Sequence, residues 1–259
     1  MGEAWLITSG KGGVGKSVTA ANLGAALWRL KRSVVLIDAD TGLRSLDVLL
    51  GMEDRVVYDL CDVAEGVCRL KQALLPDREM HGLFLIAAAQ TRDSGAVTPY
   101  QLERVTARLR DMFDFVLIDC PAGVGRGFRA AAAASDKAVI VVTPDAVAVR
   151  DAERVVGLLE QHEIRRPPLI VNRAAKEHFK KNAPFSPGRI AETLDLTVLG
   201  VIPEDRGVAR AAAEGRPVTL RRSPASAAYQ AAARRILGED MPHAPLKWFN
   251  KRGLPIAVK

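Results

Sequence analysis

The stretch that decides the fold reads ITSGKGGVGKSVT and spans residues 7–19. An apolar, strand-like run precedes it, and the pattern SVTAANLGAALWRLK at 17–31 predicts a largely buried helix after it. The stretch itself fits G-x-x-x-x-G-K-[ST], the phosphate-binding loop that connects a strand to a helix. In such a loop, glycines let backbone N–H groups turn inward around phosphate oxygens at the positive end of the helix. The sequence therefore predicts a nucleotide site at this loop.

Two side chains of the loop have a specific expected part in that site. Lys16 is expected to reach the β- and γ-phosphates, and the hydroxyl of Ser17 is expected to bind Mg²⁺. The residues of this segment that are predicted to contact the nucleotide are Gly10, Lys11, Gly12, Gly13, Val14, Gly15, Lys16, Ser17 and Val18.

Short apolar runs recur along the chain, with helical patterns between them. Their apolarity is continuous rather than alternating, which is typical of parallel strands buried on both faces. We therefore expect an α/β fold: a single doubly wound, mainly parallel β-sheet with helices on both faces. It is predicted to occupy residues 1–238 and to leave a C-terminal tail at 239–259. The predicted strands lie at 4–9, 33–38, 82–88, 114–119, 137–143, 168–172 and 197–203, and further helices at 98–112, 147–162 and 224–238.

Two other segments are interpreted from their composition. The alanine run at 130–134 is predicted to be the tightly packed start of a helix. The polar segment at 173–187 is predicted to be an exposed loop between a strand and the next helix.

Composition and cysteine content limit the class of protein. With 259 residues, of which 48% are hydrophobic, the chain is long enough for one globular domain with a large core. No apolar run approaches the ~20 residues that a membrane-spanning helix needs, and the N-terminus lacks the pattern of a signal peptide. Cys61, Cys68 and Cys120 make no even disulfide framework, and the first two are predicted to be core residues rather than metal ligands. These features favour a reducing, cytoplasmic location.

Acidic residues follow two of the predicted strands at the point where each strand ends. Asp38 and Asp40 follow one strand, and Asp119 ends another. Beside a phosphate-binding loop, such carboxylates hold Mg²⁺, directly or through water, and can orient an attacking water molecule. We predict that Ser17, Asp38 and Asp119 support the metal ion.

Two loops near these carboxylates are candidate switch segments. One is TGLRSLDVLLG at 41–51, and the other contains Gly123 and Gly125, which would allow it to move.

The positive charge is concentrated near the C-terminus. Between Arg206 and Lys259 there are eleven lysines and arginines but three acidic residues, within a chain of net charge +7. Such an excess suggests a surface that faces a polyanion, either acidic lipid or nucleic acid, although arginine-rich solvated helix faces would have the same composition.

The loop contains a lysine besides Lys16, namely Lys11, and this additional lysine indicates a resemblance to a known family. The motif KGGVGKS with this lysine is the deviant Walker A motif, and the chain is identified as a member of the MinD/ParA family of ATPases, most similar to its septum-site-determining members. Supporting stretches span nearly the whole chain: LIDADTGLRSLD, GMEDRVVYDL, QTRDSGAVT, LIDCPAG, VRDAERVVG, GVIPED and LGEDMP. The resemblance implies Mg²⁺-dependent hydrolysis of ATP, an ATP-dependent homodimer, a MinC-like division inhibitor and a MinE-like activator as partners.

The resemblance also implies roles for single residues. Lys11 would act in trans on the partner's nucleotide, with Lys16 and Asp40 completing the catalytic set. Three residues are expected to contact the base, namely Asn172, Pro203 and Asp205, and two acidic positions, Asp151 and Glu153, are expected to bind protein partners. The chain departs from the family at two positions, where Val18 and Cys120 stand in place of hydroxyl residues.

Family members end in an amphipathic helix that attaches to the inner face of the cell membrane. Here the end reads HAPLKWFNKRGLPIAVK, in which Gly253 and Pro255 limit the helix to about residues 245–254. A short helix of this kind would bind lipid by avidity when a dimer presents two copies. The residues predicted to contact the membrane are Leu246, Lys247, Trp248, Phe249, Lys251 and Arg252.

Three other functions within the wider family are alternatives. A ParA-type partition ATPase would bind DNA without sequence specificity through basic residues such as Arg206, Arg210, Arg216, Arg221 and Arg222. The apolar Trp248–Phe249 pair argues against it, so nucleic acid is not the expected partner. An electron carrier like the nitrogenase iron protein needs two cysteines at the dimer axis, and only Cys120 is near the site. The flagellar-number ATPase usually carries an N-terminal extension, whereas this chain starts at its first strand.

Overall fold

A computed structural model of the chain describes residues 1–40, 44–90, 96–180 and 182–242. Its centre is an eight-stranded sheet in the order β3-β4-β2-β5-β1-β6-β7-β8. All neighbouring strands are parallel except β3, which pairs antiparallel with β4 at one edge. The strands are β1 (Glu3–Thr8), β2 (Val34–Asp38), β3 (Leu75–Pro76), β4 (Leu83–Ile86), β5 (Phe115–Asp119), β6 (Lys137–Val142), β7 (Leu169–Ala174) and β8 (Val198–Pro203).

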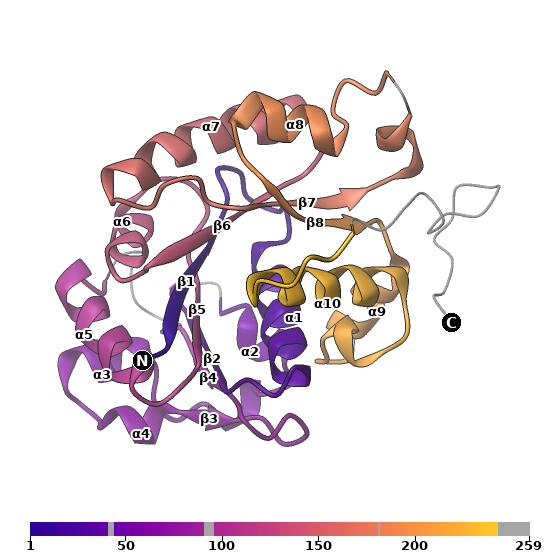
Figure 1. The fold of residues 1–259 in the computed structure, drawn as a ribbon. Coiled ribbons are helices and arrows are strands. Elements are labelled where there is room, and N and C mark those ends of the chain that lie inside the picture. Colours follow the sequence, from indigo (N-terminus) through magenta and orange to yellow (C-terminus); the bar gives the residue numbers. More distant parts are fainter. Residues whose placement is uncertain (41–43, 91–95, 181, 243–259) are drawn as a thin grey trace.

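Helices cover both faces of this sheet (Figure 1). On one face α1 packs against α10, with α2 and α9 beside them, and on the other face lie α5, α6, α7 and α8. The helices are α1 (Lys16–Arg29), α2 (Leu46–Leu49), α3 (Leu60–Glu65), α4 (Leu70–Ala73), α5 (Pro99–Arg110), α6 (Arg126–Ala133), α7 (Ala146–Gln161), α8 (Pro187–Leu194), α9 (Arg206–Ala213) and α10 (Pro224–Ile236), with short 3₁₀ turns η1 (Glu53–Arg55), η2 (Lys176–Phe179) and η3 (Val218–Leu220).

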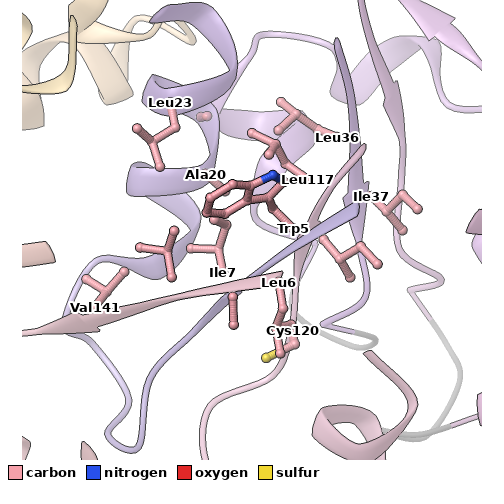
Figure 2. Close-up of a cluster of buried hydrophobic side chains, with 14 of the residues drawn as sticks. Trp5, Leu6, Ile7, Ala20, Leu23, Leu36, Ile37, Leu117, Cys120 and Val141 are labelled. Atoms are coloured by element: carbon pink, nitrogen blue, oxygen red, sulfur yellow. The ribbon is translucent and has the colours of Figure 1, made fainter. Parts of the chain in front are cut away.

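The central strand β1 is buried on both faces. Trp5 and Ile7 point towards α1, where Leu23 meets them, while Leu6 points to the opposite face beside Cys120 (Figure 2). Leu6 and Ile7 have no exposed surface, and burying an aliphatic side chain of this size contributes about 1.5–3 kcal/mol. Because β1 is fixed in this way, the loop that follows it leaves the sheet from a rigid position.

The predicted fold class is confirmed, and so are the seven predicted strands and the four predicted helices. The two-residue strand β3 was missed because it is too short to carry a hydrophobic period. The prediction that the alanine run starts a helix is wrong, since α6 begins at Arg126 and the run forms its second half. The segment predicted as a loop at 173–187 is more ordered than expected, because β7 continues to Ala174 and η2 follows. Cys61 is a core residue as predicted, whereas Cys68 is only half-buried.

Two predicted features fall partly or wholly outside the described residues. Positions 41–43 of the first candidate switch segment do so, and so do all the residues predicted to contact a membrane, from Leu246 to Arg252. Within the described ranges, none of the helices is long and apolar enough to span a bilayer.

Candidate nucleotide site

The phosphate-binding loop joins β1 to α1 in a conformation that its glycines allow. Gly15 precedes α1 in the left-handed region, with φ 93°, and no side chain caps the helix. The first N–H groups of α1 are therefore available to an anion at the positive end of the helix. A Cβ atom at Gly15 would lie 2.4 Å from Asn172 Nδ2, so a larger residue there meets both backbone strain and a collision.

Asn172 in β7 fixes this loop from the opposite side. Its Nδ2 donates a hydrogen bond of 2.8 Å to the Val14 carbonyl oxygen, and the side chain is buried. This bond uses one of the two N–H groups of the side-chain amide, so the second N–H group and the carbonyl oxygen of Asn172 remain for a base. The residue expected to contact adenine thus also holds the phosphate-binding loop.

Lys16 and two carboxylates meet where the central strands end. Asp38 and Asp119 are paired in register at the ends of β2 and β5, and both are buried, as is Lys16 at the start of α1. The charge of Lys16 acts on Asp119 and on Asp40, in each case lowering the pKa of a carboxyl that burial raises. The predicted convergence of the loop lysine with the strand-end carboxylates is therefore present.

Asp119 is an unsatisfied carboxylate. It is fully buried, and among the described residues neither of its oxygens has a hydrogen-bond partner. Burial and the nearby charge of Asp38 raise its pKa, while Lys16 and the hydroxyl of Ser17 act in the opposite direction. Orphaned carboxylate oxygens beside a serine hydroxyl are a fitting environment for Mg²⁺, which takes oxygen ligands and keeps several waters. The residues present thus fit the ion that this fold implies.

Asp38 has the same place on its strand but a different environment. Its Oδ1 accepts from Asp40 N, and its Oδ2 accepts from Ser45 N at 2.9 Å and Leu46 N at 3.0 Å. The carboxylate therefore ties down the segment that leads into α2 and has less capacity left for a metal ion than Asp119. Burial still raises its pKa, to about 6.

Substitution by asparagine should affect the stability of the protein differently at Asp119 and at Asp38. In the protein without nucleotide and Mg²⁺, folding keeps a proton on Asp119 that the unfolded chain releases above about pH 4. Its contribution to stability is therefore lost as pH rises from there towards the raised pKa of Asp119. Asp119→Asn should remove this loss. Asp38→Asn should instead destabilise the protein by about 1–3 kcal/mol, because one amide oxygen cannot accept all three N–H groups.

Urea unfolding of both variants from about pH 5 to about pH 8, with a chelator present, measures these effects. Asp119→Asn must make the free energy of unfolding less dependent on pH than it is in the wild-type protein. The raised pKa of Asp119 would be contradicted if the free energy of unfolding of the wild-type protein rose over this range and Asp119→Asn removed the rise.

A pocket of about 380 Å³ lies beside the phosphate-binding loop, between β7, β8 and α9. It brings together five residues that were predicted from the sequence to bind nucleotide, namely Gly15, Val18, Asn172, Pro203 and Asp205. Asp205 caps α9 through its side chain, with Oδ1 accepting from Gly207 N at 2.8 Å, so its backbone is what remains for a ligand. The pocket is also lined by residues that the sequence patterns did not single out: Arg173, Glu204, Arg206, Val208, Ala209 and Ala212.

Lys11 lies at the rim of the site rather than inside it. Its Nζ donates to Asp145 Oδ1 over 3.2 Å, and about 40% of both side chains is exposed. Asp145 precedes α7 and was missed, although it follows β6 as the other carboxylates follow their strands. The same helix touches the loop again, because a Cβ at Gly10 would lie 2.3 Å from the Asp151 carbonyl oxygen.

The two predicted partner-binding residues lie about two turns after Asp145 in α7. Glu153 is exposed and Asp151 is half-buried. The helix that carries them is therefore in direct contact with the start of the phosphate-binding loop.

The second candidate switch is linked to the same loop. Gly123 has φ 86° and donates from its N–H to the Ser9 carbonyl oxygen at 3.3 Å, while Ser9 Oγ donates to the Lys11 carbonyl oxygen at 2.9 Å. The segment after Asp119 is thus hydrogen-bonded to the backbone next to Lys11.

The cysteine that departs from the family pattern is enclosed. Cys120 is fully buried with its Sγ 3.5 Å from Thr8 Oγ1, and burial raises the pKa of its thiol to about 12. A thiol in this position is protonated at neutral pH and is not presented at the surface, so it does not suit a cluster shared across a dimer axis.

The arginines offered above as a DNA-binding set are mostly engaged within the chain. Arg210 and Arg221 pair with Glu214, and Arg216 pairs with Glu79. Arg206 lines the pocket beside the phosphate-binding loop. Less positive charge is left for a polyanion than the composition suggested.

Comparisons with known proteins agree with this site. The family model described as ParA: NUBPL iron-transfer P-loop NTPase matches residues 1–237. The septum site-determining protein MinD of Bacillus subtilis is 47% identical over 262 residues, which cover 100% of this chain and 97% of that protein. The chain is also similar to the MinC:MinD cell division protein complex of Aquifex aeolicus, with a TM-score of 0.87, 39% identity and coverage of 94% and 99%.

A third relative is a nucleotide complex. The septum site-determining protein MinD of Pyrococcus horikoshii complexed with Mg-ADP is similar with a TM-score of 0.83 and 27% identity, over 93% of this chain and 100% of that one. Similarity over the whole chain, together with the phosphate-binding loop that carries Lys11, assigns the family. The chain belongs to the MinD/ParA family of P-loop NTPases, within its group of septum site-determining MinD proteins.

Proposed function

We propose that the chain is an Mg²⁺-dependent ATPase that dimerises with ATP, binds an anionic membrane and positions the division site. The observation that carries the proposal is the placement of Lys11. It belongs to the phosphate-binding loop, yet it lies half-exposed at the rim of the site, where a second protomer can be reached. A lysine aimed at its own phosphates would instead be buried, as Lys16 is.

Each polar group of the site has a separate task in this proposal. Lys16 and the N–H groups at the start of α1 bind the phosphates in the ground state, and Asn172 with the α9 pocket binds adenine. Ser17 and Asp119 hold Mg²⁺, which when bound neutralises charge on the phosphate oxygens. Asp40 orients the attacking water, and Lys11 of the other protomer stabilises the charge of the transferring phosphoryl group. Products are ADP and phosphate.

Partner binding is proposed for the exposed face of α7. Glu153 is exposed there and Asp151 is half-buried beside it, and the same segment contacts Gly10 and Lys11. The similarity to MinD in a complex with MinC supports a MinC-like inhibitor as a partner. A MinE-like activator acting on the same helix would have a short path to the phosphate-binding loop.

The proposed location is the cytoplasm, with attachment to the inner face of the membrane in the ATP form. The tail sequence supports it through the apolar side chains Leu246, Trp248 and Phe249, interleaved with Lys247, Lys251 and Arg252. Burial of a large aromatic side chain contributes about 1.5–3 kcal/mol, whereas one basic residue near an anionic surface contributes about 1 kcal/mol. The aromatic residues should therefore matter at least as much as the charges.

Phe249→Glu should abolish ATP-dependent sedimentation with anionic liposomes and leave ATP hydrolysis in solution nearly unchanged. A matched control is Asn250→Glu, which adds the same charge without removing an apolar side chain and should weaken binding only about fivefold. Sedimentation is measured with ATP, with ADP and without nucleotide, and duplex DNA is added as a competitor.

This assay also separates lipid from DNA. If the tail bound DNA, Phe249→Glu would have a mild effect and DNA would displace the protein from liposomes. ATP-dependent sedimentation of a chain truncated to residues 1–243 would show that the membrane anchor lies elsewhere.

A further inference from the structure

One arginine holds the segment that directly precedes the C-terminal tail. Arg235, in the last turn of α10, donates from Nη1 to the Leu199 carbonyl oxygen in β8 at 2.6 Å. Its Nε and Nη2 donate to the carbonyl oxygens of Met241 and Pro242, each at 2.9 Å. We propose that Arg235 is the positioning residue of the membrane-binding tail, because it fixes the point at which the tail leaves the ATPase domain. This inference rests on the proposed membrane attachment and adds a residue to it.

The packing of α10 on the sheet sets the place of Arg235. The helix lies beside β8 (Figure 1), and a Cβ atom at Gly200 would lie 3.2 Å from Cβ of Ala232. The missing side chain at Gly200 therefore allows the helix to approach the strand closely. Arg235 follows Ala232 by one turn on the same face of the helix, which brings its guanidinium to the first half of β8.

The Leu199 carbonyl is available because β8 is irregular there. Between Leu169 and Ile170 the register of β7 with β8 shifts, so that the paired residues of β8 skip Leu199. An extra residue of this kind leaves backbone groups outside the ladder, and β8 lies at the edge of the sheet. The bond from Arg235 satisfies this carbonyl. One end of the cluster is therefore fixed to the sheet itself.

The chain after α10 turns back towards Arg235. Gly238 has φ 83°, a conformation that glycine adopts without strain at the end of a helix, and its N–H donates to the Arg235 carbonyl oxygen at 3.0 Å. Glu239 then pairs with Arg234 at 2.8 Å. This turn brings Met241 to the guanidinium of Arg235, whose planar set of donors can bond to two segments at once.

The expected effect on membrane binding follows from the length of chain between the last held residue and Leu246. With the bonds of Arg235, three residues (243–245) lie between Pro242 and Leu246; without them, the eight residues 238–245 follow the end of α10 at Leu237. The effective concentration of a second tail falls roughly as the −3/2 power of linker length, which is roughly fourfold for this change. A single tail has no second copy, so its affinity should not depend on Arg235.

Co-sedimentation of the full chain with vesicles of phosphatidylglycerol and phosphatidylethanolamine tests this role, with Mg²⁺ and a non-hydrolysable ATP analogue present. The variant is Arg235→Gln. The matched control is Arg234→Gln, which removes the same charge from the preceding position, where the arginine pairs with Glu239. We expect Arg235→Gln to bind roughly fourfold more weakly than the control. With ADP the two variants should bind equally weakly, and their ATP hydrolysis without vesicles should equal that of the wild-type protein.

A second variant keeps Arg235 and its contacts. Insertion of Gly-Ser-Gly-Ser after Pro242 lengthens the chain before Leu246 from three residues to seven, and it should weaken binding with the ATP analogue roughly 3.5-fold. It tests the same idea if urea unfolding shows that Arg235→Gln destabilises the domain.

The positioning role is overturned if Arg235→Gln binds as tightly as Arg234→Gln with the ATP analogue, or if the insertion has no effect. A loss of the same size with ADP also overturns it, because Arg235 would then act on the single tail. In each of these cases, analogue-dependent sedimentation of the wild-type chain leaves the proposed function intact. If the wild-type chain does not sediment with the vesicles, membrane attachment itself is wrong and the role of Arg235 is wrong with it.

Discussion

Lys11→Ala should lower the turnover of ATP by about 100- to 1,000-fold, the effect of removing one donor that stabilises charge in a transition state. The reason is the position of the residue. Lys16 already occupies the buried side of the loop, whereas Lys11 is half-exposed at the rim, which is the position that the proposed trans role requires. Affinity for ATP in the single protomer should change little, because Lys11 pairs with Asp145 at the rim and Lys16 is the buried lysine of the loop.

Three measurements check this expectation. Steady-state hydrolysis should rise more steeply than linearly with wild-type protein concentration, and this rise should disappear in Lys11→Ala. A fluorescent ATP analogue should bind both proteins with similar affinity. Lys71→Ala, which removes an exposed lysine from α4, is the control for a loss of surface charge alone. Full ATPase activity with ATP-driven dimers in Lys11→Ala would refute the trans role.

Lys16→Ala and Asp40→Ala should fail in different ways. Lys16 is buried between the loop and the strand-end carboxylates, and its removal leaves the phosphates facing Asp119 and Asp40 without a counter-charge. Loss of one partner of a buried charged pair costs about 3–5 kcal/mol, so Lys16→Ala should bind ATP at least about 100-fold more weakly. Asp40→Ala should bind ATP normally and dimerise, but it should hydrolyse about 100-fold more slowly because orienting the water matters mainly in the transition state.

Nucleotide titration followed by single-turnover hydrolysis separates the two effects, since the first reports ground-state binding and the second reports chemistry. Asp40→Asn is the conservative companion, because it keeps the shape of the side chain and loses the charge. Equal losses of ATP affinity in Lys16→Ala and Asp40→Ala would mean that the two roles have been assigned wrongly.

Much of the fold could be predicted because its signals are local. A parallel strand buried on both faces needs an unbroken apolar run, and a phosphate-binding loop needs glycines where the backbone turns, so both leave marks in a few consecutive residues. The error at α6 has a local cause as well. Alanine favours helices at every interior position, so the run could not show whether it began a helix or ended one.

The site required the tertiary structure where two residues with the same local pattern have different surroundings. Asp38 and Asp119 both end an apolar strand. Only the folded chain shows that backbone N–H groups satisfy the first, whereas the second has no hydrogen-bond partner within the described ranges. Asp145 also follows a strand, but it contacts the phosphate-binding loop through a hydrogen bond from Lys11, which is 134 residues away in the chain.

The sequence by itself determined the α/β architecture, the position of the phosphate-binding loop and the set of carboxylates at one edge of the sheet, because each depends on residues that are neighbours along the chain. Only the tertiary structure decided which strand-end carboxylate lacks a hydrogen-bond partner among the described residues, which face of α9 lines the pocket beside the phosphate-binding loop, and that Asn172 holds the loop through Val14. These contacts join segments separated by many residues, and their distances depend on how strands and helices pack, which no local periodicity records.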